Sequence, residues 1–421
     1  MKNLGTLFGY EMKKIWKRPM TWIAVLVFSA GFVWYAPIPF YNYGRTYTFT
    51  QPDGTVLSRE FTPEEQDRFM IEAPRLLSGQ PIDEEFFAKA EENIPARLED
   101  FDFSNSEDME KVREIEEQRD GYFFLVDPTY YGAYRMLGGQ NRYLHRLEWF
   151  KADVEANNNG YLTEEEIAYW TELEEQIQQP FIYEPTDAPN RLFDVLGTMG
   201  IFIPVLVALC VCDLFSQEQR ARTYPQIFSS RQGCSCLYLA KILAGSATSV
   251  LAAAIGIGAV IAASLIRYGP WGWGAAIQLC QYVSSCSFPI TARQGILVLT
   301  ALLLVYALLC GAVISLVSMW SGSGVASLAV GAALVGGQLL VLQQMWILEM
   351  MVSAVPLLQD MLAYLPIALV NASVLTGKKL AHFFGLTLNY IQAGILVYLA
   401  VTVLLAALCW LGWRRKAVSG T

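Results

Sequence analysis

The sequence has 421 residues, of which 54% are hydrophobic and only 16% charged, and its formal net charge is −9. Soluble globular domains carry about 25% charged residues, so this composition excludes an ordinary soluble protein. Several apolar runs exceed about 18 residues, the length at which a helix crosses the hydrocarbon core of a bilayer. The sequence therefore predicts an all-α polytopic membrane protein.

The acidic residues are concentrated in one hydrophilic block. Residues 41–191 hold 33 Asp and Glu against 14 Lys and Arg, a net charge of −19, while the rest of the chain holds 6 acidic and 16 basic residues. We expect this block to form a separate domain on one side of the membrane. Charged stretches such as DMEKVREIEEQRD favour an α-rich fold, and turn-rich stretches such as FTQPDG leave α+β open as an alternative.

Residues 1–19 combine apolar and basic side chains. Apolar residues recur there at helical spacing, at Leu4, Leu7, Phe8, Ile15 and Trp16. Lysines lie between them and Pro19 follows, a pattern typical of an amphipathic helix in the membrane interface. The alternative is a basic start to the first span. No cleavage site follows the first apolar run, so we expect it to be a retained span.

Hydropathy predicts six membrane spans. They are expected at 20–40, 193–215, 237–266, 295–319, 324–347 and 391–413. With six spans, the basic N-terminus, the loop 216–236 and the tail 414–421 fall on one side, which the positive-inside rule makes cytoplasmic. The acidic block 41–191 is then extracellular.

Residues 348–390 are predicted to form broken or re-entrant helices at the outer face. A seventh span at 353–374 is the alternative, but it contains Pro356, Asp360 and Pro366 and would place the basic tail outside. Irregular backbone at membrane depth is tolerated where protein buries it.

The third and fifth spans are crowded with Gly, Ala and Ser, as in KILAGSATSVLAAAIGIG and GVASLAVGAALVGG. Because lipid supplies no hydrophobic drive for helix association, small residues that let backbones approach closely mark helix–helix contacts. We expect these contacts within the chain or between two copies of it.

No catalytic constellation is evident. The two histidines, His145 and His382, are far apart in sequence. Gly377-Lys378-Lys379 lacks the upstream glycine and the Ser or Thr of a phosphate-binding loop. We therefore predict that the chain is not an enzyme and carries no cofactor itself. Cys280 and Cys286 fall in one outer loop, where either a disulfide or two free thiols can be expected.

The stretch EANNNGYLTEEE, residues 155–166, resembles a calcium-binding loop. Aligned on Gly160, its ligand positions are occupied by Glu155, Asn157, Asn159, Tyr161 and Glu166. The first position of such a loop is normally Asp, and Glu is longer. The alternative is a capping box, in which Thr163 and Glu166 start the following helix after an ordinary turn.

The segment 217–241, QEQRARTYPQIFSSRQGCSCLYLAK, lies between two apolar runs and carries most of the local signal. It resembles the intracellular loop of type-2 ATP-binding-cassette permeases, the membrane subunits of bacterial exporters. The matching residues are Glu218, Thr223, Ile227, Phe228, Ser229, Ser230, Arg231 and Lys241. The start GYEMKKIWKRP, with Glu11, is similar to the family's elbow helix, and a large outer domain after the first span is found in one bacterial branch.

This resemblance implies a permease in a bacterial cytoplasmic membrane, paired with a second permease copy. A separate ATPase subunit would bind ATP and Mg²⁺, and the loop would transmit its movement to the spans. The residues expected to couple the two subunits are Glu11, Glu218, Arg222, Thr223, Ser230, Arg231 and Lys241. Charged groups there would give directional docking. The alternative is that the arginines only anchor the spans to anionic lipid.

Two other classes of function remain open at this stage. A membrane receptor whose acidic outer domain binds a ligand is the second hypothesis, although no sizeable cytoplasmic output domain is evident. An integral membrane enzyme is the third. Ionisable residues in the spans are nearly confined to Asp194 and Lys241, which disfavours proton coupling and favours an amphipathic or apolar cargo. Nothing indicates a nucleic-acid partner.

Overall fold

The computed structural model shows a mostly helical chain. It describes residues 4–36, 46–50, 56–60, 75, 78–86, 142–157, 162–229, 235–343, 364–383 and 386–419. Within these ranges, seven helices build the main body: α1 (Leu4–Trp16), α2 (Pro19–Tyr35), α11 (Asp187–Val211), α14 (Cys236–Tyr268), α15 (Ala292–Ser321), α16 (Gly324–Gln343) and α20 (Tyr390–Ser419).

Long apolar helices dominate the bundle. Within the described residues, five helices are long and apolar enough to cross a membrane, namely α11, α14, α15, α16 and α20. Helix α2 is apolar but has 17 residues, about 26 Å at 1.5 Å per residue. The chain is therefore a membrane-embedded, polytopic α-helical protein.

The helices overlap the predicted spans, and α14, α15 and α20 reach beyond them at both ends. Helix α11 begins at Asp187, before the predicted span 193–215, but ends at Val211, four residues before that span does. The ends of the first and fifth predicted spans, 37–40 and 344–347, lie outside the described residues. Helices continue past the apolar run because a helix need not stop at the edge of the hydrocarbon.

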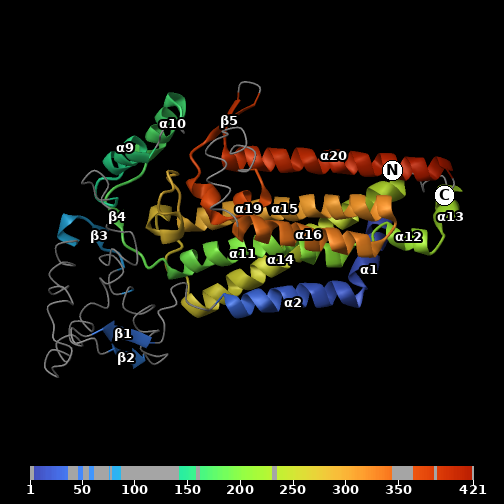
Figure 1. The fold of residues 1–421 in the computed structure, drawn as a ribbon, viewed down its shortest axis with the longest axis horizontal. Coiled ribbons are helices and arrows are strands. Elements are labelled where there is room, and N and C mark those ends of the chain that lie inside the picture. The colour runs from blue at the N-terminus through green and yellow to red at the C-terminus, as the bar shows by residue number, and fades with distance from the viewer. Residues whose placement is uncertain are drawn as a thin grey trace.

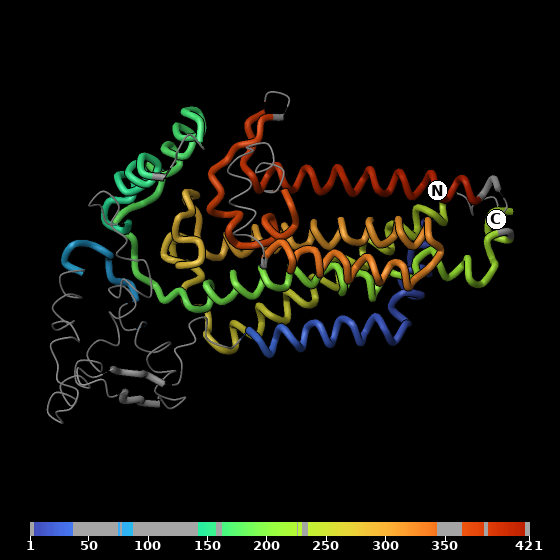
Figure 2. Tube along the Cα trace, in the orientation of Figure 1, coloured from blue at the N-terminus to red at the C-terminus, as the bar shows by residue number. Residues whose placement is uncertain are grey.

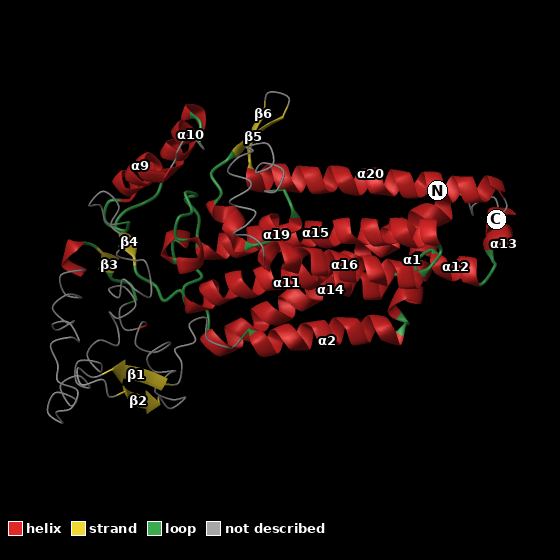
Figure 3. Cartoon of the chain, in the orientation of Figure 1, coloured by secondary structure: helices red, strands yellow, loops and turns green. Residues whose placement is uncertain are grey.

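All these helices except α1 run side by side along the bundle (Figure 1), whereas α1 runs across one end of it (Figure 2). The two ends of the chain lie at this same end, together with α12 (Ser216–Arg220) and α13 (Tyr224–Ser229). We call it the loop end. In the described residues, strands occur only at the opposite end, here called the domain end (Figure 3).

Helix α11 is the centre of the core. It packs against α2, α14, α15 and α16. Its side chains Leu192, Phe193, Leu196, Met199 and Ile203 are all fully buried. A helix that is apolar all round is stable only when neighbours or lipid surround it, and here the neighbours are protein.

Small residues sit where helices approach closely. A Cβ added to Gly311 of α15 would lie 2.4 Å from Ser249 Oγ of α14, and one added to Gly245 would lie 2.7 Å from a methyl of Leu214. Gly331 of α16 faces Ala208 of α11 in the same way, at 2.5 Å. The small residues of the third and fifth predicted spans thus make helix–helix contacts within the chain.

The domain end combines short helices and strands. Its helices are α9 (Arg146–Asn157), α10 (Glu164–Glu175) and α19 (Pro366–Leu369), with 3-10 turns η3 (Ile277–Leu279), η4 (Gln281–Val283) and η5 (Ala372–Thr376). In the part of the chain that the structure describes, three antiparallel strand pairs join β1 (Thr46–Thr50) to β2 (Val56–Glu60), β3 (Pro81–Ile82) to β4 (Phe181–Ile182), and β5 (Leu380–Phe383) to β6 (Leu386–Asn389). The described part of 348–390 contains two short helical segments, α19 and η5, but its last residues form the β5–β6 pair where helix was expected.

Candidate coupling site at the loop end

The described part of the loop 216–236 is folded as two short helices. Between α12 and α13 the chain turns sharply, with Arg222 in the left-handed region at φ 53°. Both the backbone N–H and the hydroxyl of Thr223 donate to the Glu218 carbonyl, at 3.1 and 3.3 Å. These bonds close the turn. Ser230 and Arg231 lie outside the described residues.

Lys241 is the centre of a buried ionic cluster. Its side chain has no exposed surface, and its Nζ donates to Glu218 Oε1 at 2.7 Å, to Glu11 Oε2 at 3.1 Å and to the Leu214 carbonyl at 2.9 Å. An ammonium group has three donors, and all three find an acceptor here. The charge of Lys241 is thus compensated within the chain.

Lys14 completes this cluster. Its Nζ donates to Glu218 Oε1 and lies 3.9 Å from Glu11 Oε2. Two ammonium groups and two carboxylates give the cluster no net charge, as burial requires. We call Glu11, Lys14, Glu218 and Lys241 the elbow cluster. It joins α1, α12 and α14, which are distant in sequence.

More exposed polar contacts surround the elbow cluster. Arg18 donates to Gln217 Oε1 at 2.7 Å and lies 3.9 Å from Asp213, which also pairs with Arg220. On the other side, Lys416 of α20 donates to Gln219 Oε1 at 2.9 Å. Helix α12 is therefore connected both to the start of α2 and to the last helix.

The turn between α15 and α16 closes tightly on α12. Gly322 has a left-handed φ of 63°, and a Cβ there would lie 2.1 Å from Gln219 Oε1. A Cβ on Gly324 would lie 2.4 Å from Asp213 Oδ1. Glycine lets these backbones approach, so this turn is also part of the loop end.

An aromatic cluster holds α13. Trp413 of α20 is fully buried, and its ring centroid lies 5.7 Å from Phe215, 5.6 Å from Tyr224 and 5.0 Å from Phe228. The Tyr224 hydroxyl donates to the Phe215 carbonyl at 3.1 Å. Sequence reasoning missed Trp413 and Tyr224. The available signal was the stretch YPQIF, whose aromatic and apolar side chains are not needed for a loop that only carries basic residues.

The predicted coupling residues therefore separate into two groups. Glu11, Glu218 and Lys241 lie together in the interior, and Glu218 is only 7% exposed. Arg222, with Arg220, Gln226 and Ser229, is exposed on the surface of the loop. The interior group connects helices, and the exposed group lies on the surface of the loop end.

At the domain end, Glu166 is engaged within the chain. Thr163 and Glu166 form the capping box that starts α10. The same carboxylate accepts from the Leu380 N–H at 2.8 Å and lies 3.3 Å from Lys379 Nζ. Glu155 is exposed in α9, whereas the side chain of Asn157 and the whole of Asn159 and Tyr161 lie outside what the structure describes. The capping-box interpretation is confirmed.

The two helices α9 and α10 are fixed to the bundle by buried polar contacts. Arg146 and Glu174 form a buried ion pair at 2.8 Å, and Arg146 also donates to the carbonyls of Ser284 and Cys286. Trp170 Nε1 donates to the Lys378 carbonyl. These contacts join the helix pair to two separate connections of the bundle at the domain end.

Cys280 and Cys286 are both buried free thiols, so the structure does not contain the disulfide considered between them. Burial raises the pKa of the Cys286 thiol to about 12 and makes it unreactive. Both side chains pack into the apolar core, where cysteine behaves as a small hydrophobe.

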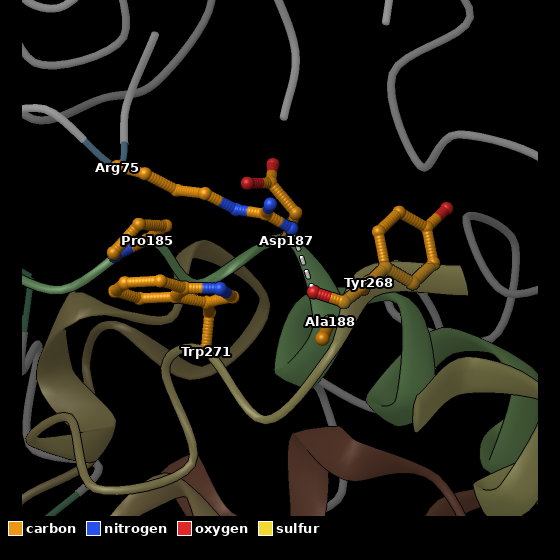
Figure 4. A pocket seen from close by; sticks show the side chains of 6 residues that line it. All are labelled: Arg75, Pro185, Asp187, Ala188, Tyr268 and Trp271. Carbon is orange, nitrogen blue, oxygen red and sulfur yellow. Dashed lines mark hydrogen bonds between the residues drawn. The ribbon is translucent and has the colours of Figure 1, made fainter. Parts of the chain in front are cut away.

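A small cavity lies between Arg75 and the ends of α11 and α14 at the domain end (Figure 4). The Arg75 guanidinium lies 5.4 Å from the Trp271 ring centroid and donates to the Tyr268 carbonyl at 2.8 Å, with Asp187 beside it. The cavity volume of about 10 Å³ admits about one water molecule. The contacts of Arg75 therefore join these segments of the chain, and the cavity beside them is too small for a ligand.

Among the described residues, no group of three or more His, Cys, Asp or Glu side chains could hold a metal ion. Comparison with protein-family models, with curated proteins and with solved structures gave no match to this chain.

Proposed function

We propose that this chain is the membrane-spanning permease subunit of an ATP-driven exporter, coupled through the loop 216–236 to a separate ATPase subunit. The observation that supports this most is the elbow cluster, in which Lys241 joins Glu11 of α1 to Glu218 of α12. A loop that served only to connect two spans would have no need of such a cluster.

Mechanically, the loop is suited to transmit a displacement. The elbow cluster ties it to α1 and α14, and the packing of Tyr224 and Phe228 on Trp413 ties it to α20. Breaking any of these contacts would uncover charged or apolar groups that are now buried. A partner that pulls on α13 would therefore move the helices with it.

The exposed face of the loop is the proposed docking surface. Arg220 and Arg222 are exposed there, close to the turn between α12 and α13. We assign Glu218 to the interior connection, because its carboxylate is engaged by Lys14 and Lys241. Arg231 remains a proposed docking residue from the sequence alone.

In this proposal the loop end faces the bacterial cytoplasm and 41–191 is extracellular. Helix α2 supplies the first of six spans, and a second permease copy completes the pathway. The partner ATPase binds ATP and Mg²⁺, and this chain catalyses no reaction itself. The basic residues at the loop end support this orientation.

The test is recovery of a partner ATPase. Tagged full-length protein is purified from its native membrane in mild detergent, and the eluate is assayed for ATP hydrolysis and for a protein with a phosphate-binding loop. We expect both. Changing Arg222 to Glu should lower ATPase recovery several-fold, because it reverses a charge on the docking surface.

Arg267→Glu is the matched control, since Arg267 lies at the far end of α14. It should leave ATPase recovery unchanged. If no ATPase co-purifies with the unaltered protein, the transporter proposal is wrong. A receptor whose outer domain binds a ligand would then be the better hypothesis.

A further inference from the structure

A long apolar groove runs between α2 and α11. It has a volume of about 480 Å³ and is lined almost wholly by apolar side chains. Its aromatic wall is formed by Phe28, Phe32 and Phe202, with Phe32 and Phe202 ring centroids 6.1 Å apart. Gly31 leaves open space, since a Cβ there would meet nothing within 4 Å.

One face of α11 lines this groove and becomes polar at the domain end. Thr198, Phe202, Val205 and Leu209 recur along it at intervals of three or four residues. Asp194 lies one turn before Thr198, whose hydroxyl donates to the Asp194 carbonyl at 3.1 Å. The helical spacing therefore places Asp194 at the outer end of the same face.

Only one of the two carboxylate oxygens of Asp194 accepts hydrogen bonds from the described residues. Oδ2 accepts from Arg191 at 2.6 Å and from the Tyr35 hydroxyl at 3.3 Å, and Arg191 also lies over the Tyr35 ring. Oδ1 has no partner among the described residues, and the side chain is 19% exposed. Asp194 is not one of the groove's lining residues, but Tyr35 is, so its hydrogen bond to Asp194 places a fixed acceptor directly beyond the groove.

A second apolar groove provides a contrast. It lies between α1 and α14 and has a volume of about 590 Å³, with Leu4, Phe8 and Leu243 in its walls. None of the residues that line it is ionisable. Ordinary lipid chains can fill such a groove, and nothing in its walls selects a headgroup.

We propose that the groove between α2 and α11 binds an amphipathic molecule with an ammonium head, its apolar chain along Phe28, Phe32 and Phe202 and its head on Asp194 Oδ1. An ammonium group donates hydrogen bonds to a carboxylate oxygen, whereas a carboxylate head has no proton to donate to it. Describing this molecule as the cargo rests on the proposed transport function, but the binding site itself does not.

The test uses the isolated full-length chain in phosphatidylcholine nanodiscs, so it needs no ATPase. Hexadecylamine bearing a diazirine is photo-crosslinked, and labelled peptides are identified by mass spectrometry. The matched probes are the corresponding acid and alcohol. We expect the amine to label peptides of α2 and α11 about tenfold more than the acid, the scale of one charge-assisted hydrogen bond.

Two variants separate the groove from the fold. Gly31→Leu should fill the groove and abolish labelling there. Gly258→Leu is the matched control, since Gly258 of α14 also has nothing within 4 Å of an added Cβ and does not line the groove. Asp194→Asn should remove the preference for the amine over the acid while apolar labelling persists.

Equal labelling by amine and acid would overturn the headgroup assignment, and labelling that Gly31→Leu leaves unchanged would overturn the site. Competition by added phosphatidylethanolamine would identify a lipid headgroup as the source of the ammonium. Competition by unlabelled hexadecylamine alone would identify a free amphipath. A positive result without any co-purifying ATPase would keep the site and discard its role in ATP-driven export.

Discussion

Lys241 has the strongest expected effect of any single residue at the loop end. Lys241→Met keeps the apolar stem but leaves Glu11 and Glu218 sharing only Lys14. Removing one partner of a buried ionic cluster costs about 3–5 kcal/mol. We expect a clear fall in the thermal unfolding midpoint of the purified protein, followed by tryptophan fluorescence.

A double variant and a control sharpen this test. Lys241→Met with Glu218→Gln removes one charge of each sign and should recover part of the loss. Arg220→Met removes a charge whose side chain is 59% exposed, and exposed pairs contribute at most about 1 kcal/mol. Equal effects of Lys241→Met and Arg220→Met would contradict the burial argument.

Glu166 makes the contact between α10 and the β5–β6 hairpin pH-dependent. Burial raises the pKa of this carboxyl, but the N–H groups of Leu380 and Thr163 and the charge of Lys379 outweigh it and hold the pKa below its ordinary value. The folded state therefore binds this proton more weakly than the unfolded state. Its stabilising contribution is complete above the ordinary Glu pKa of about 4.3 and is lost as the pH falls through the lower, folded value.

Hydrogen exchange of the Leu380 amide, corrected for intrinsic rate, measures this contact. Protection should be constant from neutral pH down to about 4.3 and decrease only below it. Glu166→Gln should weaken protection at neutral pH and flatten this dependence. An unaltered pH profile in that variant would exclude Glu166 as the group responsible.

Three members of the elbow cluster, Glu11, Glu218 and Lys241, could be named from the sequence, but neither the fourth, Lys14, nor the arrangement of the cluster could. Glu218 and Lys241 belong to the motif of the loop, and Glu11 to the start of the chain. That Lys241 is fully buried between them depends on α1 crossing the bundle, and Glu11 and Lys241 are 230 residues apart. Trp413 was missed because it adjoins the basic tail. A tryptophan next to basic residues is already explained as a membrane anchor, so nothing in the sequence indicated that it lies in the interior.

At the scale of elements, the contact between α14 and α15 depends on two small residues. A side chain at Gly311 would meet Ser249 Oγ at 2.4 Å and Ser249 Cβ at 3.1 Å. Gly311→Leu should therefore destabilise the protein by about 1–3 kcal/mol through overpacking. Gly258→Leu, in open space, should have little effect, and the thermal midpoints of the two variants can be compared directly.

If Gly311→Leu were as stable as Gly258→Leu, the close helix approach would not be a determinant of the bundle.

The long helices of the bundle could be predicted from the sequence, because the length and hydropathy of a segment decide whether it forms one. The β5–β6 hairpin could not, since its strands have four residues each and pack on α20. Short strands depend on their tertiary surroundings more than on periodicity.

At the scale of the whole molecule, the positions of the two chain ends constrain the number of crossings. Both lie at the loop end (Figure 1), and a chain that begins and ends on one side of a membrane must cross it an even number of times. Within the described residues, five helices are long enough to cross, which is an odd number. In the proposed topology helix α2 is therefore the additional span, and its length of about 26 Å would be accommodated by local thinning of the bilayer or by flanking side chains that reach to the interface.

This topology makes a prediction for intact cells. Green fluorescent protein fused to the C-terminus should fluoresce, because it folds only in the cytoplasm. Cysteine placed at the exposed Glu155 should react with a membrane-impermeant maleimide added outside, whereas cysteine at the exposed Gln226 should react only after permeabilisation. The unsubstituted protein sets the background, since the described native thiols are buried or half-buried.

The two cysteine positions must give opposite results for the argument to hold. Labelling of both from outside would mean that α11 does not cross the membrane, since it lies between them in the chain. Reversal of both would keep the helical bundle but place the loop end outside. An ATP-dependent partner could not then reach α13, so this measurement also decides whether the coupling proposal is physically open.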